Sequence, residues 1–246
     1  MTKTIDTHTH ILADATVKLM QQEIPSLGLK MTPFDQDNAV CEVAGVAYRP
    51  FPRGGHDVER RFKDMDAAEV DVHVLSAAPQ TWLYNQEAAV GIAGADRLRS
   101  YYLNNLVGNP LDTTIAGACL IFGGVLERYP RLNFVMVHGG GFIPYQGGRW
   151  VHGWHVRPEP KVHLTHSPQP YLDRFLYDTI THSKPALEYL VSLTGANRVF
   201  LGSDYPYDMG TGECVRQVRA ANISAADRDI ILGDHVAKIL SKHRRA

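Results

Sequence analysis

The stretch Asn133–Gly141, NFVMVHGGG, is an apolar run that ends in a histidine and three consecutive glycines. The run Asn133–Val137 predicts a short buried strand, and the glycines predict a sharp turn directly after it, where a ligand could approach the backbone closely. His138 would then stand at the carboxyl end of that strand. A phosphate-binding loop is the weaker interpretation, because no lysine or serine follows as a P-loop requires. A glycine turn with an incidental histidine is the simpler alternative.

Two other segments place ligand-type side chains where a predicted strand ends. In DTHTH, residues 6–10, His8 and His10 are two positions apart, so they point to the same side of a strand and can converge on one ion. In LGSDYP, residues 201–206, Asp204 follows a late strand and precedes a proline. Taken singly, these could be polar residues at a strand exit or an N-capping aspartate. Together with His138, they indicate one active-site face at the carboxyl ends of parallel strands.

Strands that alternate with helices predict a parallel α/β architecture. The predicted strands end near residues 9, 77, 137, 180 and 202. The predicted helices are 57–69, 112–129 with Asp112 as its N-cap, 184–194 and 225–242. A closed (β/α)8 barrel needs eight strands, so five strands predict an incomplete barrel, and we expect the two flanks of the gap to come together. We expect a single domain over residues 1–246, with a Pro- and Gly-rich loop or hairpin excursion at about 31–57.

Composition limits the classes of function. Of the 246 residues 44% are hydrophobic and 21% charged, with a net charge of -1, so a strongly basic surface for nucleic acid or an anionic membrane is not expected. The three cysteines lie far apart and form no CxxC pair. The first residues lack an apolar signal segment, and the longest near-apolar stretch, 115–126, is shorter than the roughly 20 residues of a membrane helix. We expect a soluble, cytoplasmic protein with neither nucleic acid nor membrane as partner.

The chain resembles the amidohydrolase-related decarboxylases typified by 2-amino-3-carboxymuconate 6-semialdehyde decarboxylase. The matching stretches near the beginning are IDTHTHIL, RRFKDMD and VDVHVLSAAP. Those further on are YYLNNLVGNPLDTTIAGACLIFGGVLERYPRLNFVMVHGGGFIPYQGGRWVHG, FLYDTITHS and VFLGSDYPYDMG. The resemblance covers nearly the whole chain, and the HGGG-x-x-PY-x-x-GR pattern is specific to this branch. It implies a (β/α)8 fold of the metal-dependent hydrolase superfamily.

The resemblance also implies residue roles. The implied ligands of a divalent metal, with zinc expected, are His8, His10 and Asp204. His138 would be the acid/base histidine. Arg53 and Arg149 resemble arginines that grip substrate carboxylates, as bidentate guanidinium groups do. In family members the latter arginine reaches into the neighbouring subunit, which implies a homodimer, and no organic cofactor is required.

The sequence departs from this family in its central region. Family members run through a third, fourth and fifth strand, the last ending in a His-Pro pair that supplies a further metal ligand. Here Trp82–Asn85 leads almost directly to Arg97–Tyr102. Three strands and one imidazole are therefore absent. Without that imidazole, His138 could itself become a metal ligand. His73 is interpreted as packed on its strand. The later histidines, interpreted as structural or exposed, are His152, His155, His163, His166 and His182.

The combined interpretation is a metal-dependent, cofactor-free decarboxylase of a small unsaturated or aromatic carboxylic acid. One alternative is a metal-dependent hydrolase of a small ester, lactone or amide, using the same metal site. A second alternative, favoured by the absent strands, is an inactive remnant with a dimerising or regulatory role.

Overall fold

The computed structural model describes residues 3–78 and 100–243 of the chain. The strands are β1 Ile5–Ile11, β2 Lys30–Pro33, β3 Asn38–Val43, β4 Val46–Pro52, β5 Val72–Ala77, β6 Val135–Met136, β7 Leu176–Asp178 and β8 Val199–Phe200. The helices are α1 Asp14–Glu23, α2 Val58–Ala67, α4 Asn109–Phe122, α5 Val125–Arg128, α6 Ile143–Val156, α7 Gln169–Leu172, α8 Lys184–Thr194, α9 Cys214–Ala220, α10 Ala225–Asp229 and α11 His235–His243. The junction predicted between residues 85 and 97 lies outside the described residues.

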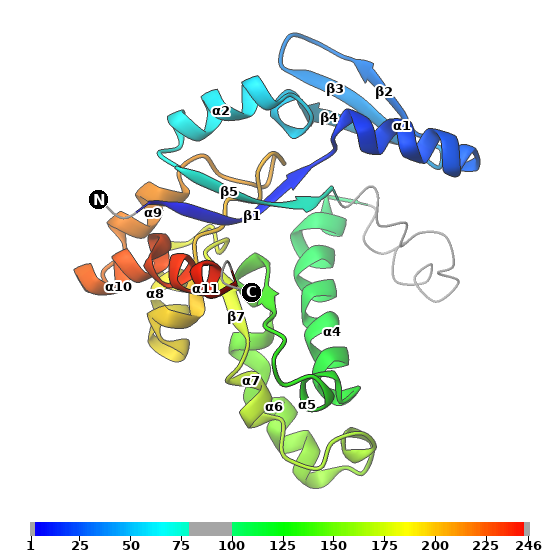
Figure 1. Cartoon of the computed structure of the whole chain (residues 1–246). Coiled ribbons are helices and arrows are strands. Elements are labelled where there is room, and N and C mark those ends of the chain that lie inside the picture. The colour runs from blue at the N-terminus through cyan, green and yellow to red at the C-terminus, as the bar shows by residue number, and fades with distance from the viewer. Residues whose placement is uncertain (1–2, 79–99, 244–246) are drawn as a thin grey trace.

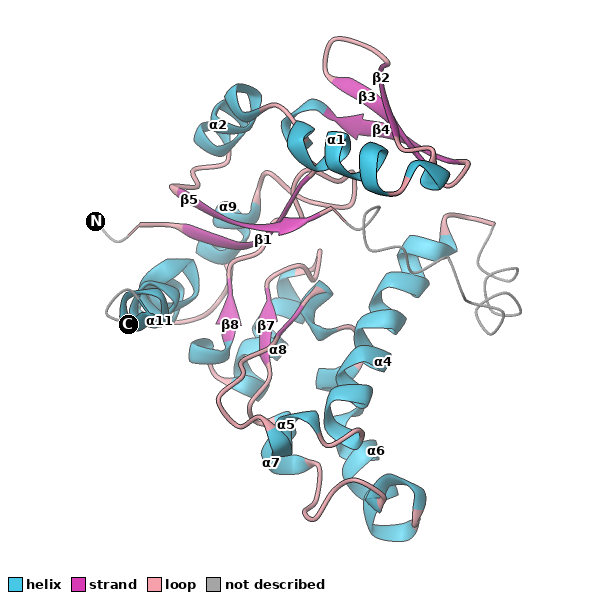
Figure 2. Ribbon diagram, turned by 45° about the vertical axis from the view of Figure 1, so that its right-hand side comes forward, coloured by secondary structure: helices cyan, strands magenta, loops and turns pink. Residues whose placement is uncertain are grey.

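Five parallel strands form an open arc. β1 pairs with β5, and β7 lies between β6 and β8, all in parallel. The segment after β8 joins β1 through a parallel bridge from Thr9 to Tyr205 and a hydrogen bond from the Asp204 amide to the His8 carbonyl, 2.9 Å. The arc therefore runs β5-β1-β8-β7-β6 (Figure 2). All five predicted parallel strands are present, and the described residues form no closed barrel.

The ends of the arc, β5 and β6, do not pair with each other in the part of the chain that the structure describes. The flanks of the gap lie largely among residues 79–99, outside the described residues, so the expectation that they come together stays a prediction, while β5 and β6 remain unpaired with each other. The physical reason is that strand number, tilt and stagger are linked in a barrel, so five strands with the curvature of an eight-stranded barrel span an arc and cannot close.

Residues 30–52 form a separate three-stranded antiparallel sheet, β2-β3-β4. The sheet and α1 lie together beyond the carboxyl end of β1 (Figure 1). A small apolar core fills the space between them and includes Leu12, Val17, Cys41 and Phe51. This excursion brings η2, the short turn Arg53–Gly55, against the segment after β8, because Gly54 and Gly55 leave room for Tyr205 and Pro206.

The observed helices agree in part with those predicted from the sequence. α8 begins and ends as predicted, with the Ser183 hydroxyl capping it, and Asp57 caps α2. The prediction that Asp112 is an N-cap is wrong: α4 continues from a π-helical turn, η5 Asn104–Gly108, and Asp112 lies in its first turn. The predicted terminal helix is divided into α10, a π-helical turn η9 Ile230–Asp234, and α11.

The main core lies between the β6-β7-β8 strands and the helices packed against them. Phe175 is fully buried there, and Gly117 of α4 allows close approach, because a Cβ atom at this position would lie 2.5 Å from Ile143 Cδ1. Among the described helices, none is both long enough and apolar enough to cross a membrane. The strands and helices form a packed core, which supports the carboxyl ends of the strands.

We predict that Phe175→Ala lowers the free energy of unfolding by about 3–5 kcal/mol, because it removes a large buried side chain and leaves a cavity. Urea denaturation would measure the change. The matched control is Phe34→Ala, since Phe34 is 57% exposed, and a shift of about 0.5 kcal/mol or less is expected for it. Equal shifts for the two variants would contradict this description of the core.

Candidate active site

Three ligand atoms converge at the carboxyl end of β1. His8 Nε2 lies 3.1 Å from His10 Nε2, and Asp204 Oδ1 lies 3.3 Å from the former and 3.4 Å from the latter. All three residues are buried. The i, i+2 spacing thus brings the two imidazoles together as predicted, and the loop after β8 brings Asp204 to them.

The hydrogen bonds behind these side chains decide which atoms carry protons. His8 Nδ1 lies 2.6 Å from Asp178 Oδ2, and an ionised carboxylate can only accept, so the proton is on Nδ1. Ser76 Oγ donates to the Thr9 carbonyl, so it accepts from His10 Nδ1 at 2.9 Å. Both Nε2 atoms therefore direct lone pairs toward each other and toward the Asp204 carboxylate. A bound cation would stabilise this convergence of three electron-rich atoms.

The spacing also fits a metal ion. Bonds of about 2.0–2.2 Å in a tetrahedral zinc site place neighbouring ligand atoms about 3.3–3.6 Å apart. The observed separations of 3.1, 3.3 and 3.4 Å are close to that range. A carboxylate or hydroxyl behind each metal-binding imidazole is the usual support of such a site. His8, His10 and Asp204 can therefore hold a divalent cation.

Asp178, at the end of β7, organises the site, and the sequence interpretation did not single it out. Its fully buried carboxylate accepts from His8 and from the backbone amides of His138, Gly139 and Ile180. Burial alone would raise the pKa of Asp178, but the hydrogen bonds from the His8 ring and the Gly139 amide hold it below its usual value. A signal was available, since Asp178 lies in the FLYDTITHS stretch at a predicted strand end.

His138 lies beside the three ligands but is not one of them. Its ring centroid is 5.6 Å from that of His8, and its Nδ1 lies 3.0 Å from Thr113 Oγ1 on α4. Among the described residues, the group that could hold a metal contains only the two β1 histidines and Asp204. The position of His138 therefore does not support the expectation that it becomes a metal ligand. Thr113 had no recognisable signal in the sequence.

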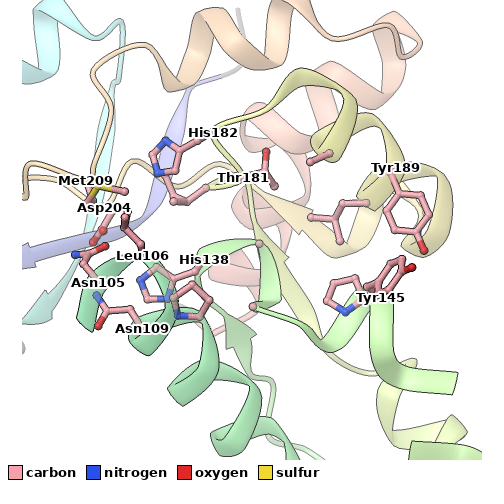
Figure 3. Close-up of a pocket in the computed structure, with 17 residues that line it drawn as sticks. Asn105, Leu106, Asn109, His138, Tyr145, Thr181, His182, Tyr189, Asp204 and Met209 are labelled. Atoms are coloured by element: carbon pink, nitrogen blue, oxygen red, sulfur yellow. The ribbon is translucent and has the colours of Figure 1, made fainter. Parts of the chain in front are cut away.

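A pocket of about 550 Å³ opens beside this cluster and is lined by both His138 and Asp204. Other polar residues on its wall are Asn105, Asn109, Tyr145, Thr181, His182 and Tyr189 (Figure 3). His182 is exposed, as the sequence suggested, yet it faces the pocket from the loop after β7. The remaining wall is largely apolar, so the pocket suits an organic molecule with a few polar groups.

The two arginines predicted to bind substrate are not among the residues that line this pocket. Arg53 begins η2, has a side chain that is 51% exposed, and donates from Nε to Asp57 at 2.7 Å. Arg149 is exposed on α6. His73 is packed as predicted, with its Nδ1 3.1 Å from Arg61 Nη1 and its ring against Tyr205.

Comparison with known proteins identifies the family of the chain. The amidohydrolase family matches residues 67–240, which is most of the chain. The chain belongs to the amidohydrolase family. It is similar to 2-amino-3-carboxymuconate-6-semialdehyde decarboxylase of Dictyostelium discoideum, 35% identical over 153 residues, covering 61% of this chain and 42% of that one. The corresponding protein of Caenorhabditis elegans is 36% identical over 146 residues, covering 58% of this amidohydrolase chain and 36% of that one. The chain thus spans about two fifths of the length of these relatives.

Solved structures establish the fold of this amidohydrolase. The apo IDCase of Metarhizium anisopliae superposes with a TM-score of 0.75 at 15% identity, covering 99% of this chain and 98% of that one. A dihydroxybenzoic acid decarboxylase from Polaromonas sp. JS666, with bound manganese and an inhibitor, gives 0.69 at 15% identity, covering 100% and 98%. The architecture is therefore TIM-barrel-like, although the described residues do not close a barrel.

We predict that Asp178→Asn lowers the free energy of unfolding of the metal-free protein by about 1–3 kcal/mol, because an amide cannot accept from all the buried donors around it. Chemical denaturation in the presence of a chelator would measure this. Asp173→Asn is the control, because the Asp173 side chain is 57% exposed and its ion pair with Arg198 is long, at 3.8 Å. If Asp178→Asn behaved like this control, Asp178 would not organise the site.

Proposed function

We propose that this amidohydrolase is a metal-dependent decarboxylase, without organic cofactor, of a small unsaturated or aromatic carboxylic acid. The observation that carries the proposal is the convergence of His8, His10 and Asp204 within 3.1–3.4 Å beside a pocket that also presents His138. The similarity to two decarboxylases at 35% and 36% identity supports the reaction type.

The metal we propose is zinc, because two imidazoles and a carboxylate, leaving one position open, form a usual catalytic zinc site. Manganese in the Polaromonas decarboxylase shows that a protein of similar fold holds a divalent ion. When bound, such an ion would act as a Lewis acid that stabilises negative charge on the substrate. The chain's own part is to hold this ion with His8, His10 and Asp204, and to keep both imidazoles oriented through Asp178 and Ser76.

His138 is proposed to move the proton. Decarboxylation breaks a carbon–carbon bond, releases carbon dioxide, and leaves the electron pair on a carbon that must then take up a proton. Because Thr113 Oγ1 holds His138 Nδ1, the Nε2 edge of the ring is available to the pocket. His138 can thus first accept a proton from the substrate or water and later return one to that carbon.

Arg53 and Arg149 are proposed as the carboxylate-binding groups. Arg53 lies in the turn that packs against Tyr205, directly after the proposed ligand Asp204. Arg149 is exposed on α6 and outside the pocket of its own chain, which suits an arginine that serves a neighbouring subunit. We therefore propose a homodimer in which Arg149 completes the partner's site.

We also propose that the barrel is incomplete because the third to fifth strands of the family are absent. Val74 and Leu75 on β5 are 37% and 51% exposed, and within the described ranges this strand pairs on one side only, with β1, which supports the proposal. The same observation favours, as a second candidate, a remnant that no longer catalyses and serves through association. Metal binding and turnover separate the two candidates.

We predict that the purified protein with added zinc releases carbon dioxide from an aromatic or unsaturated carboxylic acid, and that His138→Asn slows this release by about 100-fold or more, as loss of an acid–base group does. His152→Asn, an exposed histidine on α6, should retain the parental rate. Release would be followed across a panel of such acids with and without chelator. Tight zinc binding without turnover on any acid would favour the remnant.

A second prediction tests the shared site. Arg149→Ala and His138→Ala chains are each expected to be inactive, whereas an exchanged mixture should recover about a quarter of the parental activity, since half of the dimers would be mixed and each would have one complete site. Activity would be measured after dilution and reassociation of equal amounts. Absence of recovery, with exchange demonstrated by mass spectrometry, would place Arg149 outside the site.

A further inference from the structure

Arg61 is a buried arginine directly beneath the metal-ligand cluster. It lies on α2, in the RRFKDMD stretch, and is only 4% exposed. Burying a guanidinium group is costly unless its donors are satisfied. The neighbouring Arg60 instead pairs with Asp64 and Asp37 at the surface, so an ordinary charged helix face does not account for Arg61.

The donors of Arg61 go to segments that carry the site. Nη2 donates to the carbonyl oxygen of the ligand residue His10, and Nε donates to the Gly54 carbonyl at 3.1 Å. The guanidinium carbon lies 4.7 Å from the ring centroid of Tyr205, the residue after the ligand Asp204. One side chain thus contacts the β1 ligand strand, the η2 turn and the Asp204 loop.

His73 extends this contact toward the other ligand. Arg61 Nη1 donates to His73 Nδ1 at 3.1 Å, which leaves the histidine proton on Nε2, 3.7 Å from Asp6 Oδ2. Burial and the charge of Arg61 lower the pKa of His73 to about 4, consistent with a neutral ring. Asp6 Oδ1 in turn accepts from the backbone amides of His8 at 3.0 Å and Ser203 at 3.1 Å.

We propose that Arg61, with His73 and Asp6, forms a positioning cluster that sets the β1 histidines relative to Asp204 and thereby sets the metal affinity of the site. The inference rests on the proposed metal site. It concerns the orientation of the ligand backbone, because none of these three side chains belongs to the three-residue ligand group among the described residues. Groups that orient metal ligands typically change affinity by roughly 10- to 100-fold when altered.

The experiment is calorimetric titration of the chelator-treated full chain with zinc chloride. Arg61→Lys keeps a positive charge but loses the planar fork that reaches three acceptors, so its zinc dissociation constant should rise by about 10-fold or more. Arg174→Lys is the matched control, because Arg174 donates to the carbonyls of Leu126, Pro130 and Leu132 away from the site. This variant should bind zinc like the parent, even if it is less stable.

Thermal unfolding separates positioning from a purely structural role. A structural role would lower the melting temperature of Arg61→Lys equally with and without zinc, whereas positioning reduces the shift that zinc produces. If Arg61→Lys does not fold, two variants of His73 test the same proposal through their zinc binding. His73→Met should weaken zinc binding, and His73→Gln, which can still accept from Arg61 and donate toward Asp6, should restore it.

The outcomes separate the two proposals. If the parental chain binds no zinc, the metal site itself fails, and with it the positioning role. If the parent binds zinc and both Arg61→Lys and His73→Met bind it equally tightly, the positioning cluster is overturned while the metal site stands. Weaker binding in these variants, together with parental binding in Arg174→Lys, supports the cluster.

Discussion

The hydrogen bond between the Asp178 carboxylate and His8 Nδ1 is the interaction on which the rest of the site depends. This bond between two buried side chains is 2.6 Å long and joins β7 to β1. The same carboxylate accepts from the backbone amides of His138 and Gly139. By fixing the proton on Nδ1, it turns the Nε2 lone pair of His8 toward His10 and Asp204. The orientation of His8 toward the other two candidate ligands therefore follows from one buried acceptor.

The open arc explains why such a site can persist when a barrel is not closed. The three candidate ligands come from β1 and the loop after β8, which are adjacent in the arc, and Asp178 and His138 come from its next two strands. The contacts that orient them come from these neighbouring strands, from Ser76 and His73 on β5, and from α2 and α4. Apolar side chains are exposed at both ends of the arc, Val74 and Leu75 on β5 and Val135 on β6.

Backbone conformation adds a further constraint at the strand ends. His138 and Asp204 adopt positive φ angles of 56° and 57°, which are uncommon for residues other than glycine. Such conformations persist where surrounding contacts hold them, and they concentrate at functional sites. Here the Asp178 carboxylate holds the first residue and the His8 carbonyl holds the second. The geometry of the strand ends is thus part of the site's construction.

The sequence by itself determined the local features: five parallel strands in order, the convergence of His8 and His10, and the delivery of His138 and Asp204 to one edge. These are readable because strand alternation has a period of two and parallel strands end on a common face. It did not predict that α4 starts at Asn109. Tertiary structure alone decided the partners Asp178, Thr113 and Arg61, and placed Arg53 and Arg149 outside the pocket. Such pairs are separated by up to 170 residues, and no periodic pattern encodes a contact between side chains that only packing brings together.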